Sequence, residues 1–314
     1  MQPPSLERGA KLLAVALVAC SSVALVACSS VALVACSSTE GSTAETPPDA
    51  GVSLEAAAPS EAGARDAGAP ASDASIARCE AGSRAGASGA SEDLTSAAGR
   101  HFTVRTPGGY DPLVGSPLIV AFAPSGGTAE SVEASTKLTP DALAAGFVVA
   151  YVDTVSPANV AGAKDAATIP DRIAARWCID RGRVYLTGSS DGGGLIYTIL
   201  LNRYMTPEPA AVAPFAAGAS RATLAKASCL APPMPVMVMH NRGDAVFPGY
   251  GQAARDWWVS CNACGEGEGL ADGCVAHRDC ADGAEVRYCE GEGGHGRWPG
   301  LHASMFAFFL EHAR

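Results

Sequence analysis

The stretch that decides the fold is residues 183–201, R-V-Y-L-T-G-S-S-D-G-G-G-L-I-Y-T-I-L-L. Its first five residues form an apolar run that predicts a buried strand, and its last seven are typical of an apolar helix. Between them, G-S-S-D-G matches the pattern G-x-S-x-G with Ser190 in the middle. Flanking glycines let strand and helix pack closely around a tight turn that holds the serine in a strained conformation. The stretch therefore predicts a strand–turn–helix unit with Ser190 as candidate nucleophile. An ordinary turn built of small residues is the alternative.

The sequence on both sides of this unit alternates between apolar runs and helical patterns. A near-continuous apolar run such as P-L-I-V-A-F-A at 117–123 is expected of a strand buried on both faces. Alternation of this kind over residues 79–314 implies a mostly parallel sheet with helices on both faces. We predict strands at 101–107, 117–123, 146–153, 183–187, 210–217, 235–240 and 285–289, and helices at 129–138, 167–177, 192–204, 249–260 and 301–313.

A hydroxyl nucleophile needs a base, and the base needs an acid that orients it. In folds of this class the three follow in the order serine, acid, histidine, each in a loop after a strand. Asp244 follows the strand at 235–240, in N-R-G-D-A-V-F-P, and His295 follows the strand that ends at Cys289, in G-E-G-G-H-G-R-W-P-G. The order predicts a triad of Ser190, Asp244 and His295.

The other histidines and acids fit this order less well. We expect His302 and His312, in the last predicted helix, to be surface or packing residues. We expect His240 to form local hydrogen bonds beside the acid loop. The remaining alternatives are His101 at the start of a strand, His277 in a cysteine-rich loop, and the carboxylates Asp256, Asp272, Asp279 and Asp282.

Several motifs together resemble a known family. T-G-S-S-D-G-G, H-N-R-G-D-A-V-F-P and G-G-H-G-R-W-P-G look like signatures of the polyhydroxybutyrate depolymerase and feruloyl esterase group of secreted α/β-hydrolases, as do R-H-F-T-V-R-T-P-G-G-Y-D-P and C-I-D-R-G-R-V-Y. The resemblance covers residues 79–314 and implies an α/β-hydrolase fold. It also implies a secreted carboxylic ester hydrolase with Ser190 as nucleophile, Asp244 as acid and His295 as base. Such an enzyme needs no metal or organic cofactor, and its substrate would be a polyester or a plant-wall ester.

Two departures from the family pattern lie at the substrate cleft. The usual H-G-x-G-G loop stands here as A-P-S-G-G at 123–127, and Pro124 has no N–H to donate. The backbone groups predicted to bind an oxyanion are therefore the N–H of Asp191 and that of Ser125 or Gly126. The histidine loop, G-H-G-R-W-P, is one residue longer before its tryptophan than the family's G-H-x-W-P. The altered loop keeps open a second hypothesis, a non-catalytic or weakly catalytic surface-binding lipoprotein on an esterase scaffold.

Tryptophans near the predicted triad are candidates for contact with the substrate. Trp298 stands three residues after His295, and we predict that it binds substrate. Trp257 and Trp258 lie in a predicted helix, where packing is the better explanation.

The first 36 residues predict export rather than a folded domain. A short basic start at Arg8 and Lys11 precedes an apolar run containing three copies of V-A-L-V-A-C-S-S. Each copy resembles the bacterial lipoprotein signal, in which a cysteine is lipidated. The candidates for lipidation are Cys20, Cys28 and Cys36. We expect an exported protein, either held to a membrane by lipid at the cell surface or in the periplasm, or extracellular. A transmembrane helix over 12–36 is the alternative.

Residues 37–78 differ in composition from the export segment before them and from the predicted domain after them. Residues 37–78 carry mainly Ala, Ser, Gly, Pro, Asp and Glu, and such a segment cannot offset its ordering entropy by burial. We predict a disordered linker there and a catalytic domain over 79–314. The formal net charge of −10 argues against a nucleic-acid partner, which would require a basic patch.

Eleven cysteines are too many for a reducing compartment. Without the three cysteines of the leader, eight remain, an even number that suits disulfides in an exported domain. We expect four disulfides, and on the order of a hundred pairings are possible. The spacing C-x-x-C at 261–264 followed by C-x-x-H at 274–277 is similar to that of zinc ribbons, so a structural zinc is the alternative.

Overall fold

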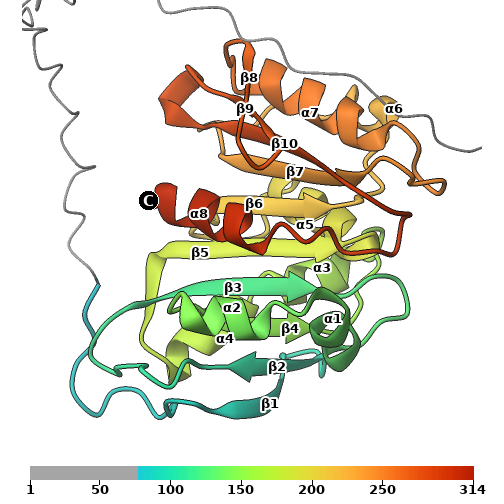
Figure 1. Ribbon diagram of the computed structural model, residues 1–314. Coiled ribbons are helices and arrows are strands. Elements are labelled where there is room, and N and C mark those ends of the chain that lie inside the picture. Colours follow the sequence, from blue (N-terminus) through green and yellow to red (C-terminus); the bar gives the residue numbers. More distant parts are fainter. Residues whose placement is uncertain (1–76) are drawn as a thin grey trace, which may run out of the picture. The chain divides into compact units, whose positions relative to one another are not determined.

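The computed structural model describes residues 77–314, whose strands form one sheet (Figure 1). The sheet has ten strands in the order β1-β2-β4-β3-β5-β6-β7-β10-β9-β8. Its central pairs, from β4 to β10, are parallel, and the pairs at both edges are antiparallel. The strands are β1 (Ser91–Thr95), β2 (His101–Arg105), β3 (Ser116–Phe122), β4 (Val148–Val152), β5 (Ile179–Ser189), β6 (Ala211–Phe215), β7 (Val236–Asn241), β8 (Gly267–Gly269), β9 (Val275–His277) and β10 (Val286–Gly291). The predicted mostly parallel sheet is confirmed.

Helices cover both faces because the central strands bury side chains on both sides. Along β3, Leu118, Val120 and Phe122 belong to one buried cluster, whereas Ile119 and Ala121 belong to a second. Helices α3 to α7 supply side chains to the first cluster, and α1, α2 and α8 supply the second. The helices are α1 (Ala129–Thr136), α2 (Thr139–Ala144), α3 (Val160–Ala166), α4 (Ile169–Arg176), α5 (Asp191–Leu201), α6 (Arg221–Leu224), α7 (Tyr250–Cys261), the 3-10 turn η1 (Ala281–Gly283) and α8 (His302–Glu311).

Every strand and helix predicted from the sequence is present, with ends that differ by a few residues. The segments missed are the edge strands β1, β8 and β9, the short helices α2, α3 and α6, and η1. Their composition explains this outcome. Strand β8 is G-E-G, without an apolar side chain, and α3 is V-A-G-A-K-D-A, whose small residues form a weak apolar face.

Disulfide bonds pair all eight cysteines of the described part of the chain, as predicted. The zinc alternative is wrong, because three of its four ligands, Cys261, Cys264 and Cys274, are bonded to other cysteines. Disulfides persist in oxidising compartments, which favours an extracellular or periplasmic protein. The pairs are Cys79–Cys178, Cys229–Cys261, Cys264–Cys280 and Cys274–Cys289.

The N-terminal predictions concern residues that the structure does not describe. The signal segment 1–36, with Cys20, Cys28 and Cys36, and the predicted linker up to residue 76 lie outside the described residues. Within residues 77–314, no helix has the length and apolar character needed to cross a bilayer.

Candidate active site

Ser190 lies at the sharp turn between β5 and α5. Its φ of 54° and ψ of −115° put it in a region that residues with a side chain seldom occupy. The Ser190 N–H donates a hydrogen bond to the carbonyl of Phe215, at 3.0 Å, which holds the turn against the end of β6. The strained turn predicted from G-x-S-x-G is therefore present.

The glycines on either side of Ser190 permit a close approach of backbone segments. A Cβ atom on Gly192 would lie 2.2 Å from the carbonyl oxygen of Phe122, and one on Gly188 would lie 2.9 Å from the same atom. Any larger residue would push α5 away from the end of β3. These glycines therefore bring the loop after β3 next to the first turn of α5.

Asp244 lies in the loop after β7, and its side chain is 1% exposed. Its Oδ1 accepts hydrogen bonds from the backbone N–H groups of Val246 and Phe247, both at 2.9 Å. Burial by itself would raise the pKa of Asp244. The hydrogen bonds from the Phe247 N–H, from His295 and from the Val246 N–H outweigh burial and hold this pKa below the ordinary value of 3.8. Asp244 is thus kept as a carboxylate.

His295 lies in the loop between β10 and α8 and connects Asp244 to Ser190. Its Nδ1 is 2.8 Å from Asp244 Oδ2, and its Nε2 is 2.9 Å from Ser190 Oγ. Because a carboxylate only accepts, Nδ1–H donates to Asp244, which leaves Nε2 free to accept the Ser190 hydroxyl proton. The edge of the Phe247 ring packs against the imidazole, with centroids 4.9 Å apart. The structure therefore brings together the three residues predicted to form a triad.

Hydrogen bonds join the acid loop directly to the histidine loop, because β7 and β10 are neighbours in the sheet. The N–H of Gly243 donates to Gly293, at 3.1 Å. The amide Nδ2 of Asn241 donates to the carbonyls of Gly294 and Arg297, at 2.8 and 2.6 Å. Asn241 thereby fixes the backbone on both sides of His295. No sequence motif singles out Asn241, and its position at the end of a buried strand is the available signal.

His240 is a second histidine beside Asp244, buried at the end of β7. Its Nε2 lies 3.5 Å from Asp244 Oδ2 and has no hydrogen-bond partner among the described residues. Burial lowers the pKa of His240 below its ordinary value of 6.5, although the Asp244 carboxylate and the backbone of Phe247 act in the opposite direction. His240 therefore packs against the acid as a neutral imidazole.

Five of the alternative bases and acids, His101, His277, His302, Asp256 and Asp272, have partners of their own. His302 bonds Asp141 through Nδ1 and the Thr136 carbonyl through Nε2, and His277 Nδ1 lies 3.2 Å from the Gly265 carbonyl. The other contacts are those of Asp256 with Arg255 and Arg221, of Asp272 with the Cys274 N–H, and of His101 with Asp93, Glu130 and Asp153.

The predicted oxyanion donors lie on two adjoining segments. Ser125 and Gly126 form the middle of a turn closed by a hydrogen bond from the Gly127 N–H to the Pro124 carbonyl, at 2.9 Å. Gly126 has a φ of +69°, as the third position of a type II turn requires. Both residues are exposed, and Asp191 is the first residue of α5. That their N–H groups bind an oxyanion stays a prediction.

A cavity of about 390 Å³ opens directly beside Ser190. Trp298 does not line it. Instead Trp298 packs edge-on against Phe215, with ring centroids 5.3 Å apart. It lines a separate cavity, together with Gly296 and Arg297 of the same loop. The cavity beside Ser190 is lined by Pro157, Ser190, Asp191, Gly194, Tyr197, Thr198, Leu201, Asn202, Gly218, Ala219, Thr223 and Phe247.

Trp257 and Trp258 have the packing role predicted for them. Trp258 is 1% exposed, and its indole N–H donates to the hydroxyl of Tyr197, at 3.1 Å. Trp257 packs edge-on against Trp258 at the border of the core.

Asn241→Leu should loosen the histidine loop, because it leaves the carbonyls of Gly294 and Arg297 without their donor. We expect a loss of about 2 kcal/mol in the free energy of unfolding and faster amide hydrogen exchange in residues 291–297. Urea unfolding and exchange mass spectrometry measure the two effects. Asn202→Ala, which removes an exposed side-chain bond to the Thr198 carbonyl, is the control and should leave that exchange unchanged. Equal exchange in Asn241→Leu and wild type would contradict the role of Asn241.

His240→Gln should reduce the extent to which the free energy of unfolding falls as the pH is lowered. A histidine whose pKa is lowered in the folded state binds protons more readily when unfolded, so its stabilising contribution is complete above pH 6.5 and is lost as the pH falls below it. Urea unfolding at about pH 7.5 and about pH 5.5 tests this. The fall in unfolding free energy should be larger in wild type than in the variant, and equal falls would contradict it.

Comparisons with known proteins identify the fold but no family. No protein-family model matches the sequence, and no curated protein matches it. Among solved structures, the chain is similar to an acetyl xylan esterase from Aspergillus awamori, with 13% identity over 71% of this chain and 99% of that one and a TM-score of 0.54. It is also similar to a thermostable esterase, with 16% identity over 72% of this chain and 63% of that one, just under two thirds of its length, and a TM-score of 0.53. The described part of the chain therefore has the α/β-hydrolase fold.

Proposed function

We propose that the protein is a serine carboxylic ester hydrolase. The observation that carries this proposal is the unbroken line of hydrogen bonds from Asp244 Oδ2 through His295 to Ser190 Oγ, at 2.8 and 2.9 Å. An ordinary strand-to-helix turn of small residues would need neither the histidine nor a buried acid. Nucleophile, base and orienting acid within hydrogen-bond reach are the arrangement that acyl transfer requires.

In the proposed mechanism, His295 Nε2 takes the proton of Ser190 as Oγ attacks the ester carbonyl carbon. The Asp244 carboxylate holds the imidazole and stabilises its positive charge. The N–H of Asp191 and that of Ser125 or Gly126 bind the oxyanion, at about 3 kcal/mol for each donor. His295 then gives the proton to the departing alcohol, which leaves an acyl group on Ser190. Water activated by His295 releases the acid and restores Ser190.

The substrate we propose is a polyester of the polyhydroxybutyrate type or a feruloyl or acetyl ester of the plant wall. Support comes from the three motifs that resemble those of polyhydroxybutyrate depolymerases and feruloyl esterases, and from the fold shared with an acetyl xylan esterase. The cavity beside Ser190 fits part of such a substrate, because apolar side chains such as Leu201 and Phe247 line it together with Thr198 and Thr223.

We further propose that the enzyme is exported from the cytoplasm and is held to a membrane by a lipid attached near its N-terminus. The repeated L-V-A-C segments supply three cysteines for lipidation, Cys20, Cys28 and Cys36, and residues 37–78 would form the linker to the catalytic domain at 79–314. The disulfides of the described residues support export, because such bonds are reduced in the cytoplasm.

Labelling with a fluorophosphonate tests the proposed chemistry, since this reagent reacts with activated serines. Wild type should be labelled and Ser190→Ala should not. His295→Ala should be labelled at least about a thousandfold more slowly, because the serine loses its base. Ser189→Ala, a change at the neighbouring serine, is the matched control and should be labelled at the wild-type rate. Intact-protein mass spectrometry measures the label.

Absence of labelling in folded wild type would reject the proposal and favour the non-catalytic scaffold that the Pro124 loop suggests. Labelling of Ser190→Ala at the wild-type rate would reject Ser190 as the nucleophile. With labelling established, rates on 4-nitrophenyl butyrate, methyl ferulate, acetylated xylan and polyhydroxybutyrate identify the preferred ester.

A further inference from the structure

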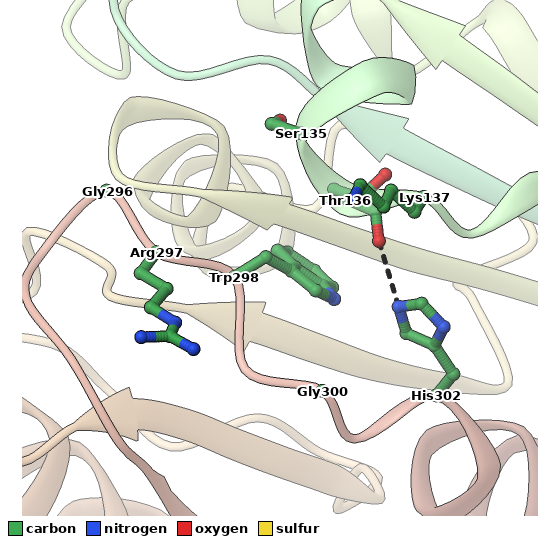
Figure 2. A pocket seen from close by; sticks show the side chains of 8 residues that line it. All are labelled: Ser135, Thr136, Lys137, Gly296, Arg297, Trp298, Gly300 and His302. Atoms are coloured by element: carbon green, nitrogen blue, oxygen red, sulfur yellow. Dashed lines mark hydrogen bonds between the residues drawn. The ribbon is translucent and has the colours of Figure 1, made fainter.

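A second cavity, of about 540 Å³, is lined in part by the histidine loop (Figure 2). It is defined here as the Trp298 cavity. Its lining includes Gly296, the residue that follows the proposed catalytic base His295 in the chain. A volume of this size holds a six-membered ring with its substituents. The lining residues are Ser135, Thr136, Lys137, Gly296, Arg297, Trp298, Gly300 and His302.

The lining of the Trp298 cavity includes two cations, although the chain as a whole carries a formal charge of −10, and a nearby carboxylate, that of Asp141, is bonded to His302. Lys137 and Arg297 both line it, and no aspartate or glutamate does. Within residues 77–314, neither cation forms a salt bridge, whereas Arg105, Arg183 and Arg287 each pair with a carboxylate. Two cations without carboxylate partners in one cavity favour the binding of an anion.

Contacts on both walls hold this lining in place. The stem of Arg297 packs over Gly293, where a Cβ atom would lie 2.7 Å from Arg297 Cδ. On the opposite wall, His302 joins the start of α8 to α1 and α2 through its bonds to the Thr136 carbonyl, at 2.9 Å, and to Asp141, at 2.8 Å. The dashed line in Figure 2 marks the first of these bonds.

Trp298 gives the cavity an apolar ring surface between the charged groups. In Figure 2 its indole lies in the middle of the lining, with Arg297 on one side and His302 on the other. The edge-on contact with Phe215 fixes the indole. An aromatic face beside cations suits a ring that carries a carboxylate, because the ring can pack on the indole while both Arg297 and Lys137 attract the carboxylate.

We propose that the Trp298 cavity binds a carboxylate carried on a ring in one half of the ester substrate. The inference rests on the proposed esterase function. The proposal assigns Lys137 and Arg297 as residues that determine specificity. It also places the predicted contact of Trp298 with substrate in the Trp298 cavity rather than in the cavity beside Ser190. The carboxylate can belong to the acyl half or to the alcohol half, and both sources share the chemistry that the cavity recognises.

Matched ester pairs distinguish the two sources. For the alcohol half, 4-acetoxybenzoate is compared with the neutral 4-acetoxybenzamide. For the acyl half, monomethyl terephthalate is compared with methyl 4-carbamoylbenzoate. In at least one of these two pairs, the kcat/KM of the anionic ester should be at least about tenfold above that of its neutral partner, as expected for a charge-assisted hydrogen bond. Salt at about 0.5 M should reduce this ratio through screening.

Substitutions of the two cations test their assignment. Lys137→Gln and Arg297→Gln should each lower the anionic-to-neutral ratio at least about threefold, since both cations contribute to it. Lys226→Gln and Arg172→Gln change exposed cations outside the cavity, are the matched controls, and should keep the wild-type ratio. A wild-type ratio near one in both pairs would overturn the proposal, as would ratios unaffected by Lys137→Gln and Arg297→Gln.

A binding measurement separates this proposal from the proposed chemistry. Titration of Ser190→Ala with 4-hydroxybenzoate and with terephthalate, followed by NMR, needs no turnover. Weaker binding of either carboxylate by about tenfold after adding Arg297→Gln supports the Trp298 cavity, even if no ester is hydrolysed and the esterase function fails. Equal binding with and without Arg297→Gln overturns the cavity proposal, even if wild type is labelled at Ser190 and hydrolyses neutral esters.

Discussion

The arrangement of the candidate site depends on the hydrogen bonds between the loop after β7 and the loop after β10. These strands are parallel neighbours, so both loops leave the sheet at the same edge. Backbone bonds from Gly243 to Gly293 and side-chain bonds from Asn241 to Gly294 and Arg297 then fix the two loops together. Without this constraint Asp244 and His295 would sit on independent loops, and the 2.8 Å contact between them would be one conformation among many. Two of the disulfides hold the segment between α7 and β10 that carries β8 and β9, and one of them includes Cys289 in β10 itself.

Ser190 reaches His295 because a second constraint acts on the other side of the site. The end of β3 approaches the first turn of α5 so closely that Gly192 cannot carry a side chain. Ser190 has its strained conformation at this point, and the close approach brings the loop that follows β3 next to the start of the helix. The two constraints meet at the bond between Ser190 Oγ and His295 Nε2. The described part of the chain has two separate cavities that involve these elements, one lined by Ser190 and Phe247, the other by Arg297 and Trp298.

The sequence predicts the centre of this molecule better than its edges, for physical reasons. Strands buried on both faces, such as β3 and β5, leave continuous apolar runs, and the triad residues follow three such strands in the expected order. Strand β8 has no apolar side chain and is stabilised by its pairing with β9, which no local pattern encodes. The pairing of the cysteines depends on the path of that same segment between α7 and β10. The spacing of the cysteines in the sequence therefore does not predict which of them pair. His240 lies beside the acid, as predicted, but its Nε2 has no hydrogen-bond partner among the described residues. The role of Asn241 is not predictable from the sequence, because its environment arises only when β7 and β10 lie side by side. The resemblance to secreted esterases predicts the roles of the candidate site residues. No sequence motif predicts the two cations of the Trp298 cavity, because Lys137 and Arg297 are far apart in the chain.

A crystal structure of the protein after reaction with a fluorophosphonate tests the account most directly, because the phosphonyl group imitates the tetrahedral intermediate of ester hydrolysis. The account predicts phosphorus bonded to Ser190 Oγ, with the phosphonyl oxygen within about 3 Å of the N–H of Asp191 and of that of Ser125 or Gly126. His295 should remain bonded to Asp244. Phosphorus on another residue, or an oxygen that meets neither Ser125 nor Gly126, would contradict it.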